Sequence, residues 1–120
     1  MKFLFVFLGG GLGSVLRYAI SRQLNNLESS ISYGTFLVNI VGSLFIGIIL
    51  GLTYKHNFLN QNQALFLAVG FCGGFTTFST FAFENSTLIK NGDYLSLAMY
   101  IIGSIILGVL AVFLGLFLVK

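Results

Sequence analysis

The sequence predicts an all-α membrane protein with four transmembrane helices, the third of them interrupted. Of its 120 residues, 57% are hydrophobic and 8% are charged, and the mean hydropathy is +0.98. Four apolar stretches each reach the roughly 20 residues that span a bilayer core: residues 3–21, 34–54, 64–90 and 94–119. The connections are short, so we expect residues 1–120 to form one domain embedded in the bilayer, with both termini on one side.

The first stretch, residues 3–21, begins like a secretory signal peptide. However, its apolar run continues to Ile20 without a small-x-small cleavage site, and Arg17 and Tyr18 lie where cleavage would occur. We therefore expect it to remain in the mature protein as the first span. Gly9 and Gly13 have the small-xxx-small spacing that allows close helix packing.

Arg17 lies about one turn from the predicted end of the first span. A guanidinium within a span is costly and normally faces a partner, a cavity or the interface. Two interpretations stay open. The side chain either snorkels to the lipid headgroups, or it attracts anions or makes structural hydrogen bonds in a vestibule.

The second stretch carries a polar stripe, because Thr35, Asn39 and Ser43 recur every four residues on an otherwise apolar helix. A hydroxyl in a membrane helix commonly bonds to its own backbone. The amide of Asn39 needs partners when it is buried, so contacts between helices and the lining of a pore are both open.

The third stretch contains poor helix formers, Gly73 and Gly74 followed by Thr76 and Thr77. Each glycine costs about 1 kcal/mol of helix stability and each threonine roughly half as much. We predict a break near residues 73–77. Broken spans are tolerated where the backbone lines a cavity or binds an ion, so the break predicts a polar path.

Phenylalanines follow the break, and Phe78 and Phe81 share roughly one helical face if the chain is helical there. By spacing alone such a stripe is typical of lipid-facing or core residues. The upstream glycines and the interleaved hydroxyls favour a functional role. Glu84 comes next, either as a vestibule carboxylate or as the interfacial end of the helix.

The fourth stretch has Tyr100, Ser104 and Gly108 at four-residue spacing. This second stripe has the right period to face the polar stripe of the second span.

The Lys and Arg residues show no bias between the two faces of the predicted bundle. The terminal face carries Lys2, Lys55 and Lys120, and the opposite face carries Arg22, Lys90 and, near the span end, Arg17. Because this bias sets membrane orientation, its absence suggests the hypothesis that the chain inserts both ways and assembles as an antiparallel pair.

Several classes of function are disfavoured by the residues that are missing. Cys72 and His56 are each the single residue of their kind, and no group of His, Cys, Asp or Glu offers a metal site. No nucleophile has a base beside it, so we expect no enzyme. The net charge of +3 is dispersed and forms no basic patch for nucleic acid. Transport, or a structural role in a membrane complex, remains.

If the protein transports an ion, its polar groups favour a small anion. Hydroxyl and amide hydrogens can replace an anion's water, and aromatic ring edges carry positive partial charge. A cation pore would more often show carboxylate rings or carbonyl filters. The alternative is a small multidrug-type proton-coupled exporter, which needs an ionisable carboxylate deep in a span. The first two spans have none, and Glu84 lies near the end of the third.

Three motifs resemble the Fluc fluoride channels, also called the CrcB family. They are GGLGSVLRY at residues 10–18, GTFLVN at 34–39 and GFCGGFTTFSTF at 70–81. The third is long and highly specific, and the resemblance covers essentially the whole chain. It implies passive fluoride export across the inner (plasma) membrane of a microbe by an antiparallel, dual-topology homodimer with two pores.

The resemblance also implies roles for single residues. Phe78 and Phe81 would line the fluoride path, and Asn39 would help to hold it. Arg17 and Glu84 would lie in the vestibules.

Further positions would complete the path and the centre of the dimer. Tyr100 and Ser104 match a polar track on the fourth span, where Gly108 replaces a serine found in some relatives. We place Thr35 and Ser43 on the same path. A structural sodium ion at the dimer centre would be held by the backbone carbonyls of Gly73 and Thr76.

Overall fold

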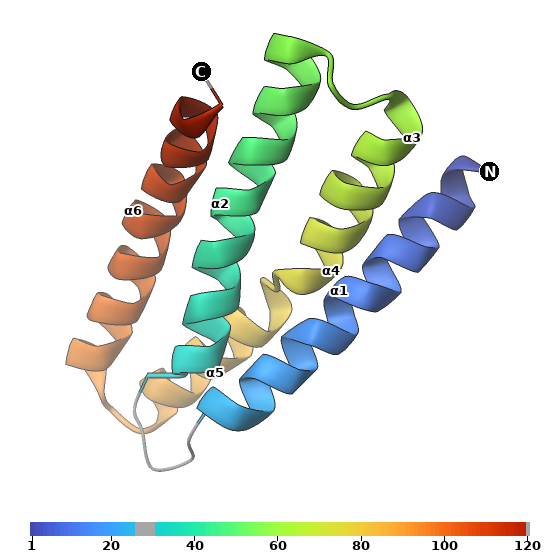
Figure 1. The fold of residues 1–120 in the computed structure, drawn as a ribbon. Helices are drawn as coiled ribbons and strands as arrows, with labels where there is room; N and C mark the ends of the chain where they lie inside the picture. Colours follow the sequence, from blue (N-terminus) through green and yellow to red (C-terminus); the bar gives the residue numbers. More distant parts are fainter. Residues whose placement is uncertain (26–30, 120) are drawn as a thin grey trace.

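The computed structural model describes residues 1–25 and 31–119. Its first two long helices are α1 (Lys2–Leu24) and α2 (Tyr33–His56), and its last is α6 (Tyr94–Leu118). Between α2 and α6 lies a rod built from several pieces (Figure 1). These pieces are α3 (Gln61–Ala64), the π-helix η1 (Leu65–Cys72), α4 (Gly73–Phe75) and α5 (Ser79–Lys90).

Within the described residues, four segments are long and apolar enough to cross a membrane, which confirms the predicted all-α class with four spans. Both termini and the connection from α2 to α3 lie at one end of the bundle, and α5 lies at the other (Figure 1). Helix α6 packs along α2, while α1 packs along η1 and α4.

Glycines bring the paired helices close together. A Cβ atom at Gly9 or Gly13 of α1 would collide with a backbone carbonyl of η1, and one at Gly115 of α6 would collide with the backbone of α2. The packing role predicted for Gly9 and Gly13 is therefore confirmed. These contacts bring the backbones within van der Waals distance, which bulkier side chains prevent.

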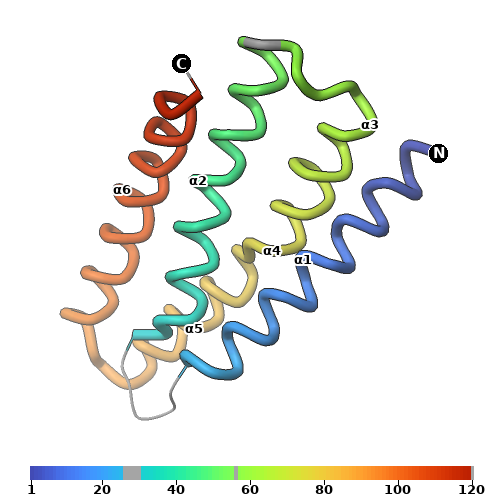
Figure 2. The backbone as a smooth tube through the Cα atoms, viewed as in Figure 1, coloured from blue at the N-terminus to red at the C-terminus, as the bar shows by residue number. Residues whose placement is uncertain are grey.

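The third span is interrupted, as predicted, but the break begins later than the expected 73–77. Gly73, Gly74 and Phe75 remain helical in α4, and the chain turns extended at Thr76, with φ −89° and ψ 160°. Regular helix resumes at Ser79, so the chain bends at residues 76–78 (Figure 2).

The glycines therefore do not cause the break. A Cβ atom at Gly74 would collide with the carbonyl of Gly10, so this glycine lets α4 approach α1. The helix ends where the side chain of Asn39, on α2, forms hydrogen bonds with the backbone N–H and carbonyl of Thr77.

Candidate functional site

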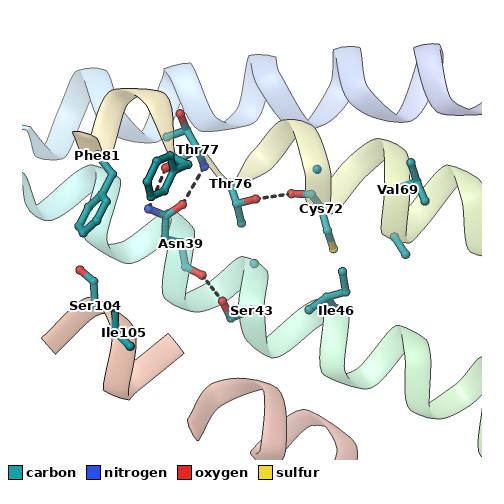
Figure 3. A pocket seen from close by; sticks show the side chains of 14 residues that line it. Asn39, Ser43, Ile46, Val69, Cys72, Thr76, Thr77, Phe81, Ser104 and Ile105 are labelled. Carbon is teal, nitrogen blue, oxygen red and sulfur yellow. Dashed lines mark hydrogen bonds between the residues drawn. The ribbon is translucent and has the colours of Figure 1, made fainter. Parts of the chain in front are cut away.

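An open pocket of about 450 Å³ lies beside the break, between α2, η1 and α6 (Figure 3). Its lining brings together most of the residues predicted for a path and for a cation site. These are Asn39, Ser43, Gly73, Thr76, Phe78, Phe81 and Ser104. The other predicted residues, Thr35, Tyr100, Arg17 and Glu84, make contacts around the pocket rather than lining it.

Asn39 holds the break through both ends of its amide. Its Oδ1 accepts a hydrogen bond from the backbone N–H of Thr77 at 2.8 Å, and its Nδ2 donates to the carbonyl of Thr77 at 3.2 Å (Figure 3). A backbone peptide at membrane depth has no water to bond, so these two bonds replace the helical ones that the break removes. Asn39 therefore connects helices and lines the pocket at once.

Two carbonyls near the break lose the partners that a continuous helix would give them. The N–H of Thr77, the helical donor for the Gly73 carbonyl, donates instead to Asn39. The N–H of Thr80, the helical donor for the Thr76 carbonyl, donates instead to Thr77 Oγ1 at 3.3 Å. Both carbonyls are thus released from helical bonding beside the open pocket.

Arg17 reaches the carbonyl of Gly74, to which its Nε donates a hydrogen bond at 3.0 Å. Ser14, one turn earlier on α1, donates to the same oxygen at 3.5 Å. Arg17 thus makes a structural hydrogen bond at the end of α4, which favours that interpretation over snorkelling. Ser14 was not among the predicted site residues, although its spacing of three residues from Arg17 places both on one face of α1.

Phe78 and Phe81 both line the pocket, with ring centroids 6.1 Å apart. The Phe78 side chain is 78% exposed, whereas Phe81 is half-buried and packs against Tyr100 with centroids 4.9 Å apart in an edge-to-face geometry. Phe75 lies elsewhere, because it is buried and stacks on Phe71. The prediction that Phe78 and Phe81 lie on the same side of the chain is confirmed.

Glu84 accepts hydrogen bonds on both carboxylate oxygens. Thr35 Oγ1 donates to Oε2 at 2.8 Å, and the Tyr100 hydroxyl donates to Oε1 at 2.7 Å. Both donors are only 1% exposed. Glu84 is therefore tied into the bundle beside the Phe81–Tyr100 pair, and it is not merely an interfacial helix end.

The polar stripes of α2 and α6 face each other. A Cβ atom at Gly108 would lie 3.6 Å from Ser43 Oγ, an ordinary contact distance. Ser43 itself donates to the Asn39 carbonyl at 2.7 Å, within its own helix. Ser104 lines the pocket, and its Oγ is buried and has no hydrogen-bond partner within residues 1–25 and 31–119.

Side-chain metal ligands do not cluster anywhere in the described part of the chain, where no three His, Cys, Asp or Glu residues come together. Gly73 lies beside open space, because a Cβ atom there would meet no other atom of the described residues within 4 Å.

Four membrane-spanning segments, three of which line a pocket of hydroxyls, one amide and aromatic rings, define a small multi-pass membrane transport protein. The chain belongs to the CrcB family: the family model described as "CrcB-like protein, Camphor Resistance (CrcB)" matches residues 4–116.

Similar proteins cover nearly the full chain. A protein of Gloeothece citriformis is 48% identical, with 100% of this chain and 98% of the relative aligned. One of Azobacteroides pseudotrichonymphae is 46% identical over 99% of this chain and 96% of its own length. One of Phocaeicola vulgatus is 47% identical over 96% of this chain and 95% of its own length.

Each of these three relatives bears the name "Fluoride-specific ion channel FluC". The family that the sequence motifs resemble is thereby confirmed. Ion channels are not enzymes, which agrees with the prediction, and the names give no support to the alternative of a multidrug exporter.

Proposed function

We propose that this chain is a fluoride-selective channel that lets fluoride leave the cell passively and so relieves fluoride toxicity. The observation that carries the proposal is the full-length similarity to relatives that are named fluoride-specific ion channels. The pocket supports it, because its polar side chains are hydroxyls and one amide rather than paired charges.

A fluoride path along the pocket agrees with the chemistry of its lining. Fluoride is small and strongly hydrated, so a path must replace its water with hydrogen-bond donors or positive partial charges. The Ser104 hydroxyl has no partner in the described chain, and the ring edges of Phe78 and Phe81 offer positive partial charge. In this proposal, Asn39 holds the break in place, Ser43 adds to the polar lining, and Thr35 and Tyr100 lie next along the path, at Glu84.

The working unit that we propose is an antiparallel homodimer with two paths. The single chain measures 48 × 29 × 19 Å, and its smallest dimension is under two helix diameters of about 10–12 Å each. It has little room to enclose a path, and its pocket and Phe78 are open. A second copy would supply the missing wall, and the even distribution of Lys and Arg permits opposite orientations.

A sodium ion at the dimer centre would satisfy the released carbonyls of Gly73 and Thr76. Hard cations prefer oxygen ligands, and both oxygens have lost their helical donors. Two antiparallel copies would bring four such carbonyls together. The ion would contribute structural stability at the break and take no part in conduction.

Arg17 and Glu84 would act at the vestibules of this path. Arg17 brings a positive charge to the end of α4, where it would raise the local concentration of anions. The carboxylate of Glu84 is compensated by two donated hydrogen bonds, which limits its repulsion of fluoride.

A flux assay tests the proposal. The purified protein is reconstituted into liposomes loaded with fluoride or chloride, and efflux is followed with ion-selective electrodes after a potassium ionophore is added. We expect fluoride to leave far faster than chloride, without any pH gradient. Fluoride efflux equal to that of protein-free liposomes would refute the proposal, and export of a cationic dye driven by a pH gradient would instead support the exporter.

A further inference from the structure

Asn25 lies at the C-terminal end of α1, and its side chain reaches across to the first turn of α2. Its Oδ1 accepts hydrogen bonds from the backbone N–H of Gly34 at 2.7 Å and of Thr35 at 3.2 Å. These amides are the second and third of the helix, which an N-cap side chain normally serves. Ser32, which occupies the N-cap position, makes no such bond with its side chain. Asn25 therefore caps α2 from a different helix.

The other end of the same amide bonds to a side chain of the proposed path. Asn25 Nδ2 donates to Thr35 Oγ1 at 3.2 Å. The orientation of the amide is fixed, because two backbone N–H groups demand an acceptor on one side and leave the donor on the other. Gly34 makes the approach possible, since a Cβ atom there would lie 2.7 Å from Asn25 Oδ1.

This donation fixes the direction of the Thr35 hydroxyl. A hydroxyl has one hydrogen to give and lone pairs to accept. Because Thr35 Oγ1 accepts from Asn25, its hydrogen is left to donate to Glu84 Oε2 at 2.8 Å. Without that constraint the hydroxyl can rotate away from Glu84.

We propose that Asn25 is a positioning residue for the anion path: it orients the Thr35 hydroxyl toward Glu84, in addition to capping α2. The orientation holds the Glu84 carboxylate between Thr35 and Tyr100, where the Tyr100 ring packs on Phe81. This inference rests on the proposed fluoride conduction. When the Thr35 hydroxyl no longer donates to Glu84, less of the negative charge of this carboxylate is offset by hydrogen bonds. The carboxylate then repels fluoride more strongly, and fluoride flux falls.

Aspartate at position 25 separates the two roles. The Asn25→Asp variant keeps acceptors for the two backbone amides, so α2 remains capped. It has no hydrogen to donate, and its carboxylate accepts from the Thr35 hydroxyl, which turns that hydroxyl away from Glu84. We expect an unchanged unfolding temperature and a roughly tenfold lower fluoride flux, the effect of losing one hydrogen bond to a charged group.

Two further variants control for stability and charge. Asn25→Ala removes both roles and is expected to lower the unfolding temperature and the flux together. Gln23→Asp adds the same negative charge at the exposed end of α1 and is expected to conduct like the wild type.

The experiment is fluoride efflux from liposomes that hold equal amounts of each variant, with thermal unfolding measured in parallel. Lower flux in Asn25→Asp with intact stability supports the inference. Wild-type flux in Asn25→Asp, an equal loss in Gln23→Asp, or unfolding of Asn25→Asp would each overturn it. If the wild type itself carries no fluoride, the proposed function fails instead.

Discussion

Replacing Asn39 by leucine removes the amide that holds the break in the third span. Leucine has nearly the same size but can make neither of the two bonds to Thr77. Each unmade bond leaves a backbone group unsatisfied at a cost of about 1–3 kcal/mol, so the break loses about 2–6 kcal/mol in total. Since about 1.4 kcal/mol corresponds to a factor of ten, even the lower figure shifts the equilibrium constant against the conducting geometry by about thirtyfold.

The assay is fluoride efflux from liposomes, with size-exclusion chromatography to check that the variant is folded and assembled. Thr53→Val is the matched control. It also removes a polar side chain from α2, but the Thr53 hydroxyl donates only to the Ile49 carbonyl of its own helix, at 2.8 Å. We expect the control to conduct normally. A folded Asn39→Leu protein with flux within about twofold of the wild type would refute the role assigned to this amide.

Other variants probe the rest of the site. Two variants, Phe78→Ile and Phe81→Ile, should each reduce fluoride flux while chromatography shows an unchanged assembly. Phe81→Ile also removes the edge-to-face contact with the Tyr100 ring. Normal flux in both variants would show that neither ring lines the path. Gly74→Ala should lower the unfolding temperature, at a cost of about 1–3 kcal/mol for overpacking against α1, whereas Gly11→Ala, with open space around it, should not. Arg17→Lys keeps the charge but loses the Nε donor to the end of α4, so flux should fall although electrostatic attraction of anions persists.

Much of the fold follows from composition and period. Apolar length locates the four spans to within a few residues, because a bilayer requires about 20 such residues. Residues four apart share one face of a helix. The four-residue spacing of Asn39 and Ser43 in the sequence therefore predicts that both lie on the same side of α2, where they line the pocket.

The exact position of the break could not be predicted from propensity. Gly73 and Gly74 are the weakest helix formers of the segment, yet they stay helical. The chain breaks three residues after Gly73, where Asn39 takes over both backbone groups of Thr77. Tertiary hydrogen bonds therefore outweigh a local preference of about 1 kcal/mol for each glycine.

Hydrogen bonds between residues far apart in the sequence could not be predicted either. Asn25 falls in a segment that was expected to be a loop, and only the packing of α1 against α2 brings its amide to Gly34 and Thr35. The carboxylate of Glu84 likewise acquires its two donors from two other helices. Such contacts depend on how the helices pack, which no local pattern encodes.

The current carried by single proteins in a planar bilayer tests the central claim, passive and selective conduction of fluoride, most directly. With equal chloride on both sides and a tenfold fluoride gradient, a fluoride channel predicts a reversal potential of about 59 mV, set by fluoride alone. A current that reverses near 0 mV under this gradient, or transport that occurs only with a proton gradient, would contradict the claim.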